Sequence, residues 1–63
     1  MDEWLTVEEV AARLKMHPET VRRWLRAEKL DGIWLSDRGG WRISQEAFAR
    51  FLAQQREASK SAA

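Results

Sequence analysis

The chain has 63 residues, of which 44% are hydrophobic and 33% charged, with a formal net charge of +1. This length predicts a single domain with little room for a ligand cavity, and the absence of cysteine excludes disulfides and thiolate metal sites. The chain has one histidine, no apolar run of the ~20 residues that span a bilayer and no secretory signal pattern. We therefore expect a soluble cytoplasmic binding module. We expect it to have no catalytic centre, metal, cofactor or small-molecule ligand.

The near-zero net charge hides an uneven distribution along the chain. Residues 1–12 carry four acidic residues and no basic one, whereas residues 13–42 carry eight basic residues against four acidic ones. Such segregation indicates a positive field directed at one partner. The alternative is an ordinary solvated surface on which basic residues cluster by chance.

A first helix is predicted over residues 7–14. Thr6 followed by Glu9 has the spacing of a capping box, in which the two residues bind each other's backbone N–H groups. Leu5 and Val10 then occupy the two positions of a hydrophobic staple. Apolar residues recur at helical spacing as far as residue 14, so the helix should end by about residue 15.

A second helix is predicted to begin at Pro18, because proline is favoured at the first position of a helix. The residue before a proline is driven out of the helical region, which separates the two helices by about three residues. Apolar residues at i, i+3 and i+4 mark the buried face: Val21, Trp24 and Leu25. Two short helices across so tight a turn predict a helix-turn-helix.

A β-hairpin is predicted from two β-prone runs, residues 33–36 and 41–43, joined by a loop over 37–40 with two glycines. Alternation along each strand predicts one buried and one exposed face. The residues expected on the buried face are Ile33, Leu35, Trp41 and Ile43. Those expected on the exposed face are Trp34, Ser36 and Arg42.

Ser44 is a good N-cap for a third helix over about 45–55, and residues 56–63 lack an apolar stripe. We therefore predict a domain over residues 1–55 and a flexible tail over 56–63. The fold class is mainly α with a small two-stranded hairpin, a winged helix-turn-helix. The expected core is Leu5, Val10, Leu14, Val21, Trp24, Leu25, Leu30, Leu35, Trp41, Ile43, Phe48, Phe51 and Leu52.

The exposed face of the second helix carries three arginines and one acid. On a helical wheel Glu19, Arg22, Arg23 and Arg26 share an arc of about 100° opposite the apolar stripe. Arginine pairs bidentately with guanine or binds phosphate, so the stripe suits the major groove of DNA, although a solubilising helix face is the alternative. The recognition-helix candidates are Pro18, Glu19, Thr20, Arg22, Arg23 and Arg26.

Within that set, the candidates for reading bases are Glu19, Thr20, Arg22 and Arg23, near the N-terminal end of the helix, and Arg26 is expected to contact phosphate. Glu19 is expected to orient Arg22 and Arg23 through i,i+3 and i,i+4 pairs, the alternative being a hydrogen bond from a cytosine amine.

Further contacts are predicted from the hairpin and from the first turn. The wing candidates are Arg38, Gly39 and Arg42, with Arg38 entering a minor groove or binding phosphate unless it is only an exposed turn residue. Arg42 could bind phosphate or stack on the indole of Trp34. Possible phosphate contacts are Thr6, Arg13, Lys15 and His17. For Trp34 itself a DNA sugar, a neighbouring protein and packing on Arg42 stay open.

Three segments together resemble the excisionase family of DNA-binding domains, relatives of the MerR-type winged helix. They are Leu-Thr-Val-Glu-Glu-Val-Ala-Ala at 5–12, His-Pro-Glu-Thr-Val-Arg-Arg-Trp-Leu-Arg at 17–26 and Trp-Arg-Ile at 41–43. The resemblance covers about residues 4–53. It departs at the wing, where residues 36–40 are longer and less basic than the usual Gly-Arg-Arg turn and Trp34 replaces a polar residue.

The resemblance implies a recognition helix in the major groove and a wing at the minor groove. It also implies neighbouring copies that bend DNA so that an integrase or other recombinase excises. We therefore expect a sequence-specific double-stranded DNA-binding protein without enzymatic activity. Its expected role is that of a recombination directionality factor at the nucleoid, and we expect no membrane partner. The alternatives are a small MerR-like transcriptional regulator and a protein-binding adaptor.

Overall fold

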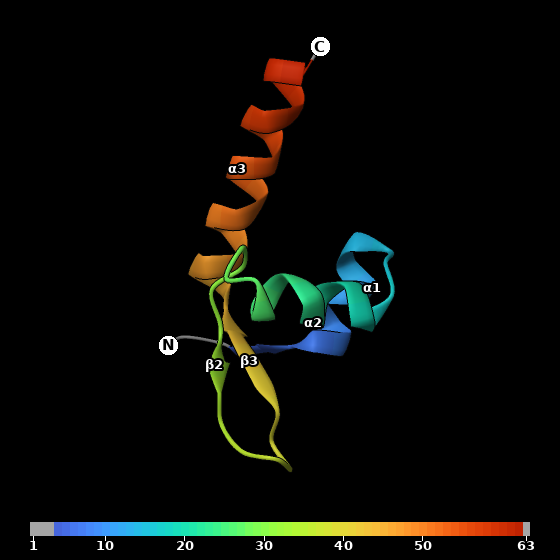
Figure 1. Cartoon of the computed structure of the whole chain (residues 1–63), viewed down its shortest axis with the longest axis vertical. Helices are drawn as coiled ribbons and strands as arrows, with labels where there is room; N and C mark the ends of the chain where they lie inside the picture. The colour runs from blue at the N-terminus through green and yellow to red at the C-terminus, as the bar shows by residue number, and fades with distance from the viewer. Residues whose placement is uncertain (1–3, 63) are drawn as a thin grey trace.

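The computed structural model describes the backbone of residues 4–62 and the side chains of residues 4–59, and it confirms the predicted fold class (Figure 1). Residues 1–3 and 63, which the predicted domain and tail include, lie outside the described residues. The elements in chain order are β1 (Trp4–Thr6), α1 (Val7–Leu14), α2 (Pro18–Arg26), β2 (Ile33–Trp34), β3 (Trp41–Ser44) and α3 (Gln45–Ala62).

The predicted capping box at the start of α1 is confirmed. Thr6 Oγ1 accepts a hydrogen bond from the Glu9 N–H at 3.0 Å, and Glu9 Oε1 accepts one from the Thr6 N–H at 2.9 Å. The backbone N–H of Thr6 is the main reason that the pKa of Glu9 is lowered. At the other end, Lys15 takes a left-handed conformation with φ of 56°, which stops α1 one residue after Leu14.

Helix α2 begins at Pro18, as predicted, after a three-residue connection from α1. Its inner face is held by Val21 and Leu25, which are buried, and by Trp24, which is half-buried. The Trp24 ring packs on Phe51 of α3 with centroids 4.9 Å apart. The three helices therefore meet on the apolar side of α2 and leave its arginine side exposed.

The sheet has one strand more than predicted. Its order is β1-β3-β2, and β3 is antiparallel to both neighbours. In β1, Leu5 lies opposite Ile43 of β3, and both are buried in the core. The start of α1 and the wing, defined here as β2, residues 35–40 and β3, are thus joined through one central strand.

The predicted face assignment of β2 is wrong. Trp34 lies opposite Trp41, and Ile33 lies opposite Arg42. Because opposed residues of antiparallel strands point to the same face, Trp34 shares the core-side face with Trp41 and Ile33 lies on the outer face. Leu35, placed in the core by the sequence, is 57% exposed because it follows Trp34 by one residue and so lies on the outer face with Ile33.

The core lies between the helices and the inner face of the sheet. Its buried residues are Leu5, Val7, Val10, Ala11, Val21, Leu25, Leu30, Ile43, Ala47, Phe48 and Phe51. Leu14, Trp24, Trp41 and Leu52 are half-buried against it. Apart from Leu35, every residue predicted for the core belongs to one of these two groups.

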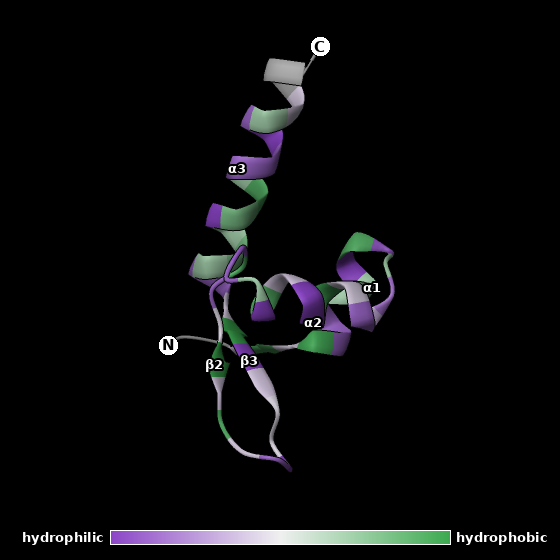
Figure 2. Ribbon diagram, in the orientation of Figure 1, coloured by the Kyte–Doolittle hydropathy of each residue, from purple (hydrophilic) through white to green (hydrophobic). Residues whose placement is uncertain are grey.

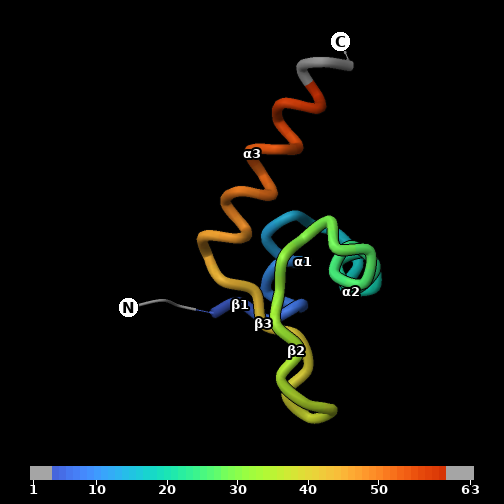
Figure 3. The backbone as a smooth tube through the Cα atoms, turned by 60° about the vertical axis from the view of Figure 1, so that its left-hand side comes forward, coloured from blue at the N-terminus to red at the C-terminus, as the bar shows by residue number. Residues whose placement is uncertain are grey.

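Helix α3 is longer than predicted. Ser44 Oγ accepts a hydrogen bond from the Ala47 N–H at 3.0 Å, which confirms the expected N-cap, but the helix continues to Ala62 instead of ending at residue 55. Figure 3 shows α3 and the wing pointing in opposite directions from the rest of the molecule. Every side chain from residue 53 to residue 59 is exposed. The division into a domain and a flexible tail remains a prediction.

Candidate nucleic-acid interface

A hollow of about 470 Å³ separates α2 from the wing, and we call it the α2–wing groove. The helices line it with Val7, Glu8, Arg22 and Arg26. The wing lines it with Trp34 and residues 37–42. Figure 2 shows hydrophilic residues on α2 and at the tip of the wing. Its lining contains four arginines and two acids, so it favours an anionic ligand.

Two of the α2 arginines are held by carboxylates. Arg22 Nη2 lies 3.2 Å from Glu8 Oε2 of α1, and its Nη1 lies 3.5 Å from Glu19 Oε1. Arg26 Nη2 lies 2.9 Å from Glu19 Oε2, and this hydrogen bond is the main cause of the lowered pKa of Glu19. The predicted pairing of Glu19 with Arg22 is confirmed, but its second partner is Arg26 instead of Arg23.

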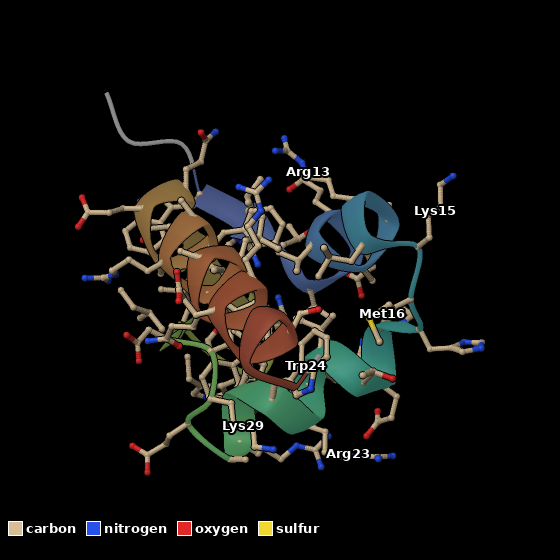
Figure 4. All side chains as sticks on the ribbon, turned by 90° about the horizontal axis from the view of Figure 1, so that it is seen from above. Arg13, Lys15, Met16, Arg23, Trp24 and Lys29 are labelled. Atoms are coloured by element: carbon tan, nitrogen blue, oxygen red, sulfur yellow. The ribbon has the colours of Figure 1, made fainter. Side chains whose placement is uncertain are left out.

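Arg23 is the exception on this helix. Among the described side chains it takes part in no ion pair or side-chain hydrogen bond, and it is exposed. Figure 4 shows Arg23 pointing away from α3, whereas Trp24 lies between α2 and α3. Pro18 and Thr20, at the start of the helix, are partly buried. Arg23 is therefore free to meet a ligand without giving up a partner.

The two wing arginines differ in how they are held. Arg38 is exposed at the loop tip, whereas Arg42 Nη1 donates hydrogen bonds to the carbonyl oxygens of Gly39 and Trp41. Arg42 thus braces the loop. The stack of Arg42 on Trp34 that the sequence left open does not form, because the two residues lie on opposite faces of the hairpin. Trp34 packs instead on Trp41, edge to face, with ring centroids 5.5 Å apart.

The residues predicted to contact phosphate are not all on one surface. Lys15 and His17 are exposed in the turn that precedes α2. Thr6 uses its hydroxyl in the capping box. Figure 4 shows Arg13 and Arg23 on opposite sides of the helix pair, so the structure does not bring Arg13 to the surface that carries Arg23.

Two features of the groove were not predicted from the sequence: the contact of Glu8 with Arg22 and the face on which Trp34 lies. Glu8 of α1 binds Arg22 of α2, which lies 14 residues later in the sequence. Local sequence patterns do not predict a contact between two helices at that separation. Trp34 was assigned to the other face of the wing because residues 33–35 are all apolar and do not define an alternation.

Over residues 4–62, no helix is long and apolar enough to cross a membrane. Within the same part of the chain, no group of three or more histidine, aspartate or glutamate residues could hold a metal ion.

The comparison with protein families agrees with this geometry. A family model described as a helix-turn-helix domain matches residues 4–56, which include all six elements except the last part of α3. The family is a DNA-binding one that includes excisionase-like members and is typically non-enzymatic. No curated protein matches the chain.

Proposed function

The chain belongs to the helix-turn-helix domain family, and from that premise we propose that it is a sequence-specific double-stranded DNA-binding protein. The observation that carries the proposal is the α2–wing groove, lined by Arg22 and Arg26 on one side and by Arg38 and Arg42 on the other. We propose that one sugar–phosphate strand of the DNA lies in this groove. The exposed face of α2 then enters the major groove while the wing reaches the adjacent minor groove.

Within this proposal the residues of α2 have different roles. Thr20 lies in the first turn of α2, the part of a recognition helix that meets base edges, and Arg23 meets a base because no carboxylate holds it. Glu19 orients Arg22 and Arg26. Arg22 and Arg26 bind phosphate. Their carboxylate partners hold them in place in the free protein, and exposed ion pairs contribute only about 0–1 kcal/mol, so phosphate can replace a carboxylate at little cost.

The remaining predicted contacts lie at the edges of this surface. Lys15 and His17 bind phosphate where the turn enters α2. On the wing, Arg38 meets the minor groove or its phosphates, and Gly39 lets the backbone of the loop approach. Arg42 keeps the loop in shape through its two backbone hydrogen bonds and adds charge to the groove.

Salt dependence tests the DNA proposal. With about four to six phosphate contacts, the logarithm of the binding constant should fall with the logarithm of salt concentration at a slope of about −4 to −5. Fluorescence anisotropy with a labelled duplex at several salt concentrations measures it. Binding that does not change between low and moderate salt contradicts the proposal and favours the protein-binding adaptor.

We further propose that the protein is an excisionase-like directionality factor of the cytoplasm and nucleoid, which binds beside copies of itself and bends DNA for an integrase. Support comes from the resemblance of residues 17–26 to the recognition helix of that family. We expect excision by a candidate integrase on attachment-site DNA to require the protein. Excision that proceeds equally without it leaves the MerR-like regulator as the better assignment.

A further inference from the structure

We propose that Trp34 packs its indole against the deoxyribose of the DNA strand that occupies the α2–wing groove. This inference rests on the proposed function. It adds Trp34 to the arginines that are proposed above to contact DNA, and Trp34 belongs to the wing rather than to the recognition helix.

The position of Trp34 supports the assignment. Its pairing with Trp41 puts the side chain on the core-side face of the hairpin, and it lines the groove together with Arg22, Arg26 and Arg38. The indole is nevertheless 52% exposed. A large aromatic ring that is half open to water within a basic groove has apolar surface to offer to whatever fills that groove.

The neighbours of Trp34 specify the chemistry of the occupant. Arg22, Arg26 and Arg38 favour an anion, whereas the Trp34 ring in the same lining favours C–H groups. A sugar–phosphate strand presents both within one nucleotide, since each phosphate is flanked by the C–H groups of a deoxyribose. The edge-to-face contact with Trp41 holds the indole in place before the strand arrives, so little side-chain freedom is lost on binding.

The chain contains a matched control. Trp4 is 45% exposed, close to the value for Trp34, but it lies on the outer face of the same sheet. There it lines a different hollow of about 310 Å³ with Ile33, Leu35 and Arg42, and only Arg42 also lines the α2–wing groove. If exposure alone made a tryptophan important for binding, Trp4 and Trp34 would behave alike.

The first test compares Trp34→Ala, Trp34→Phe and Trp4→Ala in duplex binding at several salt concentrations. We expect Trp34→Ala to weaken binding roughly five- to tenfold, the effect of losing a few tens of Å² of apolar contact, with the salt slope unchanged. Trp34→Phe should keep most of the affinity, and Trp4→Ala should stay within about twofold of the original protein. Arg38→Ala, as a phosphate-contact control, should reduce the slope by about one.

The second test uses the unaltered protein and does not depend on the stability of any variant. In the NMR spectrum of the complex, the Trp34 ring protons should show contacts to deoxyribose protons, and those of Trp4 should show none. Trp34 contacts to two successive bases, with the stack between them interrupted, would mean insertion and overturn the sugar assignment.

The outcomes separate this inference from the proposed function. If the original protein binds DNA with the expected salt slope and Trp34→Ala, shown to be folded by its circular dichroism, binds equally well, the inference is wrong and the proposed function stands. If the original protein does not bind DNA at all, the proposed function is wrong and the inference fails with it.

Discussion

Replacing Ile43 with alanine is expected to leave the protein largely unfolded at 25 °C. Ile43 is 0% exposed and lies in β3, the strand that pairs with both β1 and β2. Truncating a buried isoleucine to alanine costs about 2–5 kcal/mol. A domain of this size has a free energy of unfolding of only about 3–5 kcal/mol, so little stability would be left. Urea titration followed by circular dichroism measures the loss.

The control for this prediction is Leu35→Ala, because the sequence pattern places both residues in the core and the structure places only Ile43 there. Leu35 is 57% exposed, and its truncation should change the free energy of unfolding by no more than about 0.5 kcal/mol. The milder Ile43→Val should cost about 0.5–1.5 kcal/mol and keeps the effect measurable. Equal losses for Ile43→Ala and Leu35→Ala would contradict the register of the wing.

Replacing Arg23 with alanine is expected to weaken binding to the cognate DNA site by about 1–3 kcal/mol, or roughly 5- to 150-fold, and binding to random DNA by less. Arg23 is the α2 arginine without a carboxylate partner in the described part of the chain. Its full hydrogen-bonding capacity is therefore available to a guanine edge. The cognate site is first recovered by selection from a random duplex library, and anisotropy then compares it with a scrambled duplex.

Two other arginines serve as controls for Arg23. Arg26→Ala should weaken binding to the selected and scrambled duplexes by the same factor, as expected of a phosphate contact. Arg56→Ala removes the same charge from an exposed position on α3, away from the groove, and should have little effect on either duplex. A loss that is equal on both duplexes for Arg23→Ala would reassign Arg23 to the phosphate backbone.

The helices could be predicted closely because their starts depend on neighbouring residues. The capping box of Thr6 and Glu9, the proline at 18 and the serine at 44 each act within one turn, so the sequence contains the whole signal. The end of α3 was missed for the converse reason. Its last turns contain no stop signal, such as a glycine or proline, and an apolar stripe is not needed for the helix to continue to Ala62.

The sheet and part of the candidate site were not predictable in this way. Strand β1 exists because residues 4–6 meet β3 some forty positions later in the chain, and nothing local distinguishes them from a loop. The face on which Trp34 lies depends on its register with Trp41, which three consecutive apolar residues leave undetermined. The exposed arginines of α2 were found from helical spacing, but the pairing of Arg22 with Glu8 required the packing of two helices.

The central position of β3 also determines where the chain can change its length. The loop over residues 35–40 connects the paired strands β2 and β3. Residues added to or removed from this loop therefore leave Leu5 opposite Ile43. A single insertion within β3 would instead bring Arg42 to the position of Ile43 and turn its charge into the core. During divergence the reach of this loop toward a ligand is therefore free to vary, whereas the four-residue strand that supports it is not.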